Sequence, residues 1–204
     1  MSLVTQDQQK EVADLVTDIE RGTDAEFVVV LAQRSDNYSY IPLLWAAVLA
    51  LLTPLLILLL PFWLSTFEIA VAQLAVFVAL SLLFRIPVIA IRLIPKPVRF
   101  SRAANMARRQ FLENNLHQTQ DETGVLLFIS EVEHYVEIIA DRGINKNVEQ
   151  REWQTLVDKF IQAVKSGQTH RGLLECIKGC GDILQDKVPA THQRNELPNR
   201  LVVI

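Results

Sequence analysis

Residues 41–64 constrain this chain most, because they carry no charged side chain and would, as a helix, cross the ~30 Å hydrocarbon core of a bilayer. A second apolar run covers residues 69–84 and continues, past two arginines, to residue 94. Neither run alternates in polarity as the strands of a membrane barrel do, and helices satisfy their own backbone hydrogen bonds in lipid. We therefore expect a hairpin of two membrane-spanning helices, with Pro54 and Pro61 at kinks or ends.

Lysine and arginine side chains gather beside the second run. They are Arg85, Arg92, Lys96, Arg99, Arg102, Arg108 and Arg109. The turn between the runs has only Glu68 as an ionised group, and the cytoplasmic flanks of membrane helices carry the excess of basic residues. The sequence therefore predicts a multi-pass protein of the cytoplasmic (inner) membrane with both termini in the cytoplasm. The basic residues also suit anionic lipid headgroups, although their role in setting topology is enough to explain them.

Charge and cysteine content narrow the function further. The formal net charge of -3 and the pI of 5.8 argue against a nucleic-acid-binding protein, which would carry a basic surplus on one face. The N-terminus lacks the basic and apolar regions of a signal peptide, so we expect the first span to act as the insertion signal. Cys176 and Cys180 are the only cysteines, which fits a reducing compartment. Their spacing would supply half a metal site, but we expect two small buried side chains.

The segment before the apolar block is too short to fold alone. A capping box at Thr5 and Gln8 begins an amphipathic helix that ends at Gly22. Residues 26–32 form an apolar, β-branched run typical of a strand covered on both faces. Because a piece of about 40 residues cannot bury enough apolar surface, it must pack with the chain that follows the block, on the same side of the membrane.

The segment after the block continues with helices and strands. The pattern predicts a helix over residues 99–118, and strands over residues 125–129 and 135–140 joined as an antiparallel hairpin. Two amphipathic helices follow, over residues 148–164 and 173–184. The predicted apolar face of the helix over residues 99–118 consists of Ala104, Ala107, Phe111, Leu112 and Leu116.

These elements predict an α/β fold, a small sheet sandwiched by helices and interrupted by the two-helix transmembrane hairpin. Residues 1–40 and 96–190 together form one domain, residues 41–94 form the hairpin within a crossover connection, and residues 191–204 form a C-terminal tail. We expect most of the tail to be irregular, with an apolar end that is suited to docking.

Three motifs occur in order in the soluble part. An acidic turn precedes a Gly-Val-Leu-Leu strand at residues 121–130, a Val-Glu-Ile strand leads to a glycine turn at residues 136–144, and Gly172-Leu173-Leu174 begins a helix. This order resembles the TPM-domain family, named after a thylakoid lumen protein, a photosystem accessory protein and a nematode acetylcholine-receptor modulator. Members usually have Gly-Tyr-Gly where this chain has Asp141-Arg142-Gly143, and most hold the domain outside the cytoplasm. The chain is thus similar to a membrane-anchored, cytoplasm-facing subgroup with the hairpin inserted in the domain.

Two acidic turns form a candidate metal site. Asp121 and Glu122 precede one predicted strand and Asp141 follows the next, so we expect both turns at the rim of the sheet. Their carboxylates suit Ca²⁺ or Mg²⁺, although an acidic turn is more often only solvated. The resemblance implies a similar range of roles: some bacterial relatives bind divalent cations, plant relatives are associated with acid phosphatase activity and photosystem repair, and the nematode relative with receptor modulation.

The sequence holds no Gly-rich phosphate loop, no Cys-x5-Arg motif and no Asp-x-Asp nucleophile pair. Phosphatase chemistry needs a nucleophile or a metal-bound water, together with groups that hold phosphate. We therefore expect a non-enzymatic, membrane-anchored accessory module whose cytoplasmic domain binds a divalent cation, another membrane protein or a second copy of itself. The alternative is a metal-dependent (acid) phosphatase, for which Asp121, Asp141 and Arg142 are the first residues to test.

Overall fold

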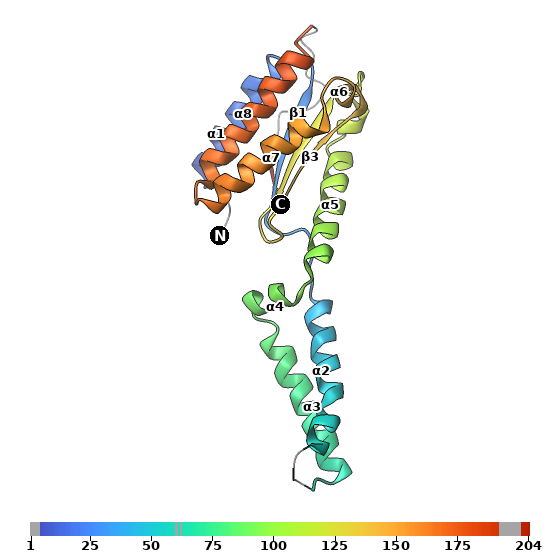
Figure 1. Ribbon diagram of the computed structural model, residues 1–204. Helices are drawn as coiled ribbons and strands as arrows, with labels where there is room; N and C mark the ends of the chain where they lie inside the picture. The colour runs from blue at the N-terminus through green and yellow to red at the C-terminus, as the bar shows by residue number, and fades with distance from the viewer. Residues whose placement is uncertain (1–4, 60, 62, 192–200) are drawn as a thin grey trace. The chain divides into compact units, whose positions relative to one another are not determined.

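Strands from either side of the apolar block pair in one sheet of the computed structural model (Figure 1). β1 (Glu26–Ala32) runs parallel to β2 (Gly124–Ser130), with Phe27 opposite Val125. β3 (Tyr135–Ala140) pairs antiparallel with β2, which confirms the predicted hairpin. The structure describes residues 5–59, 61, 63–191 and 201–204.

The chain divides into two units. One unit, here called the sheet unit, joins Met1–Ser35 to Phe100–Ile204. The other, here called the hairpin unit, is Asp36–Arg99. The sheet unit is therefore assembled from two segments that are separated in the sequence by the whole hairpin unit.

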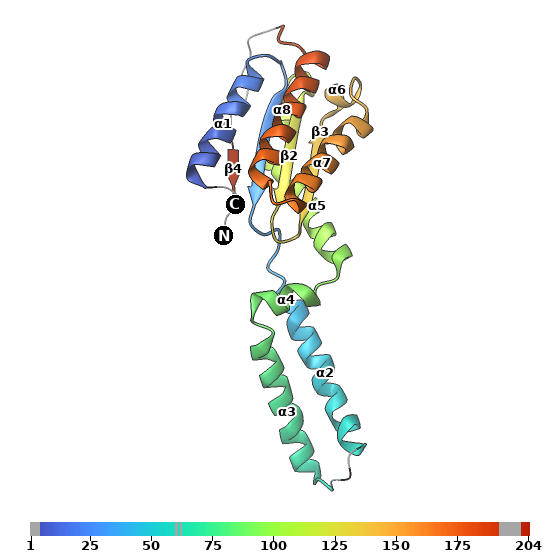
Figure 2. The same cartoon turned by 60° about the vertical axis from the view of Figure 1, so that its left-hand side comes forward.

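A fourth strand contains the apolar end of the C-terminal tail, which the sequence predicts to be suited to docking. β4 (Leu201–Val203) runs parallel to β1 at the edge of the sheet (Figure 2). The Ile204 amide donates to the Leu31 carbonyl at 3.0 Å, and the Ile204 carbonyl accepts from the Gln33 amide at 2.7 Å. The strand thus pairs an edge of β1 that would otherwise expose its hydrogen-bonding groups. Residues 192–200, which hold most of the predicted irregular tail, lie outside the described residues.

Helices cover both faces of the sheet, which confirms the predicted α/β fold. α1 (Gln6–Glu20), α7 (Gln150–Lys165) and α8 (Thr169–Lys187) lie on one face, and α5 (Lys96–Glu113) covers the other (Figures 1 and 2). Alternate residues of β1 and β2 supply the two cores, and every residue of both strands is buried. Since parallel strands need a crossover, α5 is the crossover helix between β1 and β2.

α5 ends earlier than predicted and buries a different stripe. The pattern predicts a helix over residues 99–118 with Leu112 on its apolar face, but α5 ends at Glu113 and Leu112 is 55% exposed. A left-handed residue, Asn115 with φ 57°, precedes the short 3-10 helix η1 (Leu116–Gln118). The buried stripe follows the i, i+4, i+7, i+8 spacing of one side of a helix. It consists of Ala103, Ala107, Gln110 and Phe111.

The hairpin unit contains two helices that are long and apolar enough to span a membrane. α2 (Tyr40–Leu58) and α3 (Thr66–Leu83) have mean hydropathies of 2.5 and 2.0 and lie side by side within the unit (Figure 2). Pro54 lies inside α2. α2 ends at Leu58, whereas the first span is predicted to continue to residue 64, so the helix is shorter than predicted.

The second apolar run is interrupted, whereas the sequence predicts that it continues to residue 94. Pro87 begins a separate short helix, α4 (Pro87–Leu93), and the preceding Ile86 is extended with ψ 118°, because a residue before proline is disfavoured in helical conformation. At the start of α3, Ser65 and Glu68 form a capping box in which the Ser65 amide donates to the Glu68 carboxylate at 2.7 Å. Glu68 therefore lies in the first turn of α3 and helps to cap its N-terminus.

Candidate functional site

A groove of about 530 Å³, here called the acidic groove, lies between α1 and α8 on the sheet unit. Leu15 and Leu174 supply apolar surface, and Lys10 and Lys178 offset part of the negative charge. Carboxylates at positions i, i+4, i+7 and i+11 share one side of a helix. In this groove they are Asp7, Glu11, Asp14 and Asp18 of α1.

Two of these carboxylates contact basic side chains at the surface. Glu11 Oε2 lies 2.8 Å from His170 Nε2 of α8, and Asp18 Oδ1 accepts from Arg21 at 2.9 Å. Such exposed contacts contribute little stability, so a ligand's cations can replace them at small cost. The sequence predicts α1 only as an amphipathic helix, and the groove is not among the predicted sites. The signal that indicates it is the acidic stripe, which repeats at helical spacing.

The three carboxylates predicted to bind a metal lie on two adjacent turns. Asp121 and Glu122 precede β2, and Asp141 is the N-cap of α6 (Arg142–Asn145), where its Oδ1 accepts from the first helical amide at 2.7 Å. The Gly143 amide donates to the Glu122 carbonyl at 2.9 Å. The structure therefore brings the two turns together, as expected for loops at one end of the sheet.

Backbone groups make the contact between these turns. A Cβ at Gly143 would lie 2.2 Å from the Asp121 carbonyl oxygen and 2.7 Å from that of Glu122, so only glycine fits there. Across the described residues, no group of three or more His, Cys, Asp or Glu side chains is arranged to hold a metal ion. The Ca²⁺ or Mg²⁺ site at Asp121, Glu122 and Asp141 stays a prediction.

A buried carboxylate lies at the opposite end of β2. Glu133, in the β2–β3 turn, is 1% exposed and accepts from the Ser130 hydroxyl and, at 3.2 Å, from the Ser35 amide. The Ser35 and Ser130 hydroxyl oxygens are 2.8 Å apart. The cluster ties the residues after β1 to the β2–β3 turn. Because the carboxylate is enclosed by its own donors, it acts as a structural group.

A partly buried carboxylate lies where α1 leads into β1. Glu20 Oε1 accepts from the Phe27 amide at 3.0 Å, while Oε2 is buried without a hydrogen-bond partner among the described residues. Burial raises the pKa of Glu20 to about 7, the Phe27 amide lowers it, and the charge of Glu26 raises it. Glu20 therefore changes its ionisation near neutral pH, where an ordinary glutamate does not.

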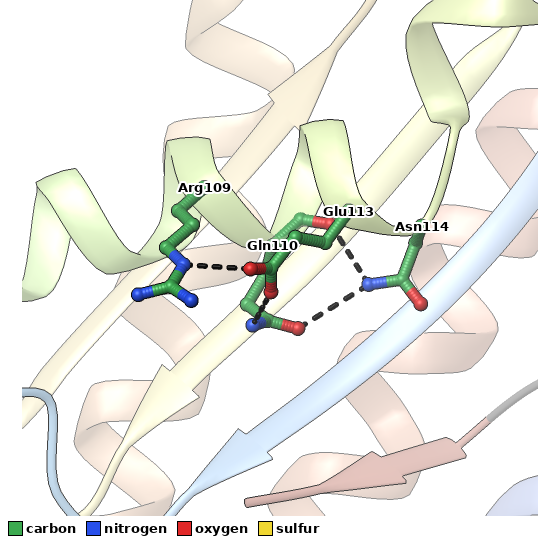
Figure 3. Close-up of polar contacts among 4 residues, drawn as sticks. All are labelled: Arg109, Gln110, Glu113 and Asn114. Atoms are coloured by element: carbon green, nitrogen blue, oxygen red, sulfur yellow. Dashed lines mark hydrogen bonds and ion pairs between the residues drawn. The ribbon is translucent and has the colours of Figure 1, made fainter.

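Figure 3 shows a polar network on α5 around a buried amide. Gln110 is 6% exposed, and its Nε2 donates to Glu113 Oε2 at 2.7 Å. Arg109 Nε donates to the other Glu113 oxygen at 2.7 Å. Asn114 Nδ2 donates to the Gln110 carbonyl at 2.8 Å and to Gln110 Oε1 at 3.3 Å. The network satisfies a polar residue that the helical spacing of α5 places on its buried side.

The two cysteines are buried, as predicted, and both are free thiols. Cys176 and Cys180 are 3% and 0% exposed. A hydrogen bond with Cys176, together with burial, raises the pKa of the Cys180 thiol. Since the thiolate is the reactive and metal-binding form, the pair packs as small side chains in the core.

Comparisons with known proteins support the motif-based resemblance. The family model of the TPM domain matches residues 88–183, from α4 to α8. The BA42 protein from the psychrophilic bacterium Bizionia argentinensis, solved by NMR, is similar over 98% of this chain and 94% of its own, with a TM-score of 0.60 and 18% identity. At that identity the likeness shows the fold alone. The comparison with curated proteins finds no match.

Proposed function

Because the chain carries a TPM domain, we propose that it is an accessory protein of the cytoplasmic membrane whose domain docks another membrane protein. The observation that carries the proposal is the position of α2 and α3, two candidate spans inserted between β1 and the crossover helix α5. Since β1 and β2 are neighbours in one sheet, both ends of the insertion return to one domain. An even number of spans permits this return, and an odd number does not.

The charge distribution supports a cytoplasmic domain. Within the hairpin unit, Glu68 lies in the first turn of α3, whereas Arg85, Arg92 and Lys96 follow the end of α3. Basic residues are retained on the cytoplasmic side during insertion. This arrangement favours both termini in the cytoplasm and the turn before α3 on the opposite side.

We place docking in the acidic groove. Cytoplasmic loops of membrane proteins carry an excess of Lys and Arg, so the segments that a tethered domain meets are basic. The carboxylates of α1 complement such a segment, and Leu15 and Leu174 offer a surface for an apolar side chain. Because exposed charges are screened by salt, we expect weak, salt-sensitive binding, which confinement to one membrane makes sufficient through a high effective concentration.

Cysteine accessibility tests the membrane topology. With Ser101→Cys and Ser65→Cys in separate full-length proteins, a membrane-impermeant thiol reagent should label position 101 only from the cytoplasmic side and position 65 only from the other side. The native cysteines are buried, so the unaltered protein is the control for background labelling. Labelling of both positions from one side would overturn the proposed topology.

Peptide binding tests the docking site. The full chain in nanodiscs should bind a fluorescent Lys/Arg-rich juxtamembrane peptide, and added salt should weaken the binding. Glu11→Gln/Asp14→Asn should reduce the affinity about tenfold, because two complementary charges are lost. Asp158→Asn/Glu175→Gln, at exposed positions of α7 and α8 that do not line the groove, removes the same charge and should leave affinity unchanged. Equal losses in both variants would contradict docking in the groove.

A divalent cation at the two acidic turns is the second candidate function, with metal-dependent phosphatase activity as its catalytic form. The observation that favours it is the contact between the turns at Gly143, which holds the three predicted ligands on neighbouring loops. Hydrolysis of a generic phosphate ester that is lost in Asp121→Ala would support the enzyme. Inactivity at every pH and with every metal tested would exclude phosphatase activity.

A further inference from the structure

α4 begins after the second candidate span has already reached a bilayer's thickness. α2 and α3 contain 19 and 18 residues, which at 1.5 Å per residue gives about 28 and 27 Å, close to the ~30 Å hydrocarbon core. With α2 and α3 in the bilayer, the residues that follow Leu83 lie outside this core. The apolar residues 86–94 therefore have another role than spanning.

α4 is bound to the end of the hairpin at which α2 begins. The Trp45 indole Nε1 donates to the Leu93 carbonyl at 3.3 Å. Ile94, 3% exposed, belongs to a cluster with Tyr38 and Ile41. Since α2 begins at Tyr40, these contacts hold α4 at the level where α2 enters the bilayer, where tryptophan is commonly found.

α4 and its flanks combine exposed apolar and basic side chains. Ile86 and Val88 are 47% and 64% exposed, and Arg85, Arg92 and Lys96 are exposed beside them. The sequence from residue 69 to residue 112 contains no Asp or Glu, so this segment carries a net positive charge. A short helix with apolar and basic residues is typical of the membrane interface.

We propose that residues 84–96 form an interfacial element that binds the phosphate groups of anionic phospholipids. Val88 and Ile86 insert between the headgroups, and the three cations contact phosphate oxygens. The charge complementarity is specific to an anionic leaflet, because zwitterionic headgroups offer each phosphate with a compensating cation. This inference rests on the proposed membrane location and adds a lipid preference to it.

Lipid binding to the full-length protein in detergent tests the proposal. Native mass spectrometry should show retention of phosphatidylglycerol over phosphatidylcholine by about tenfold or more, and high salt should reduce this ratio. Arg85→Gln/Arg92→Gln/Lys96→Gln should abolish the preference. Lys146→Gln/Lys159→Gln/Lys165→Gln, which removes the same charge from exposed positions of the sheet unit, should retain it. Equal retention of both lipids, or equal loss in both variants, would overturn the proposal.

Two further arms separate this proposal from its alternatives. Inorganic phosphate at matched concentration should not displace the lipid, and full displacement would identify a soluble-phosphate site instead. Val88→Cys labelled with a polarity-sensitive fluorophore should report an apolar environment in vesicles, whereas labelled Lys159→Cys should report water. The topology assay at positions 65 and 101 is independent of lipid headgroup, so a correct topology without lipid preference refutes only this inference.

Discussion

The backbone amide of Ser35 lies 3.2 Å from each carboxylate oxygen of Glu133. Ser35 is the last residue of the sheet unit before the hairpin unit begins. The contact therefore attaches the segment that follows β1 to the β2–β3 turn. Ser130, the last residue of β2, donates to the same carboxylate. One buried acceptor therefore binds both β2 and the segment that follows β1.

Glu133→Ala should lower the free energy of unfolding by about 2–3 kcal/mol, because it leaves the Ser35 amide and the Ser130 hydroxyl without their charged acceptor. Thermal unfolding of the detergent-solubilised protein measures this loss. Glu131→Ala, in the same turn at a less buried position, should have a much smaller effect. Similar losses in the two variants would show that the buried hydrogen bonds of Glu133 do not contribute to the free energy of unfolding.

Glu20 should make stability depend on pH. Burial raises the pKa of Glu20 from 4.5 to about 7, so the folded state binds this proton more tightly than the unfolded state does. Stability from this group is therefore fully present below about pH 4.5 and is lost as the pH rises through about 7. Glu20→Gln, which retains an acceptor for the Phe27 amide, should stabilise by about 2 kcal/mol at pH 8, allowing for partial exposure, and little at pH 4.5.

Urea unfolding of wild type and Glu20→Gln at several pH values measures this effect. Asp14→Asn, on the exposed side of the same helix, is the matched control and should not reproduce the stabilisation at pH 8. A Glu20→Gln profile parallel to that of the wild type would contradict the predicted linkage.

Ile204→Pro should destabilise the sheet unit by about 1–2 kcal/mol, because proline removes the amide that donates to the Leu31 carbonyl. Alternate amides of an edge strand point away from the sheet, so Val203→Pro, one residue earlier, should cost less. Hydrogen exchange of the β1 amides, with thermal unfolding, compares the two. Equal effects would argue against the β1–β4 pairing as a source of stability.

A cation bound by Asp121, Glu122 and Asp141 should raise the melting temperature on addition of Ca²⁺ or Mg²⁺, because a ligand of the native state stabilises by RT ln(1 + [L]/Kd). Asp121→Asn/Asp141→Asn should remove the shift. Asp158→Asn/Glu175→Gln removes the same charge elsewhere and should retain it. No shift at millimolar concentrations of either metal would exclude this site.

Some elements were predictable because their signals are local. The unbroken apolar run of β1 and the Thr5–Gln8 capping box depend on neighbouring residues, and the structure shows both. Pro87 also acts locally, because a proline disfavours helical conformation at the residue before it, and the helix breaks there between α3 and α4. The buried stripe of α5 also differs from the prediction: the apolar pattern places Leu112 in it, but Gln110, about 200° away around the helix, is buried instead.

The candidate sites depend less on local signals. The acidic stripe of α1 can be read from spacing, but its position beside α8 cannot, because the two helices are separated by most of the chain. The adjacency of the Asp121 and Asp141 turns follows from the predicted β2–β3 hairpin. Their carboxylate orientations do not, because side-chain rotamers depend on packing.

The sequence by itself determined that two apolar helices interrupt a small α/β domain, since hydrophobic length and periodicity are properties of contiguous residues. Only the tertiary structure decided that Leu201–Val203 pair with β1, that the Ser35 amide donates to the buried Glu133, and that Leu93 of α4 accepts from Trp45 in the first turns of α2. Each of these contacts joins residues distant in the chain. Their formation depends on which surfaces remain unpaired after the core has assembled, and no local pattern encodes that.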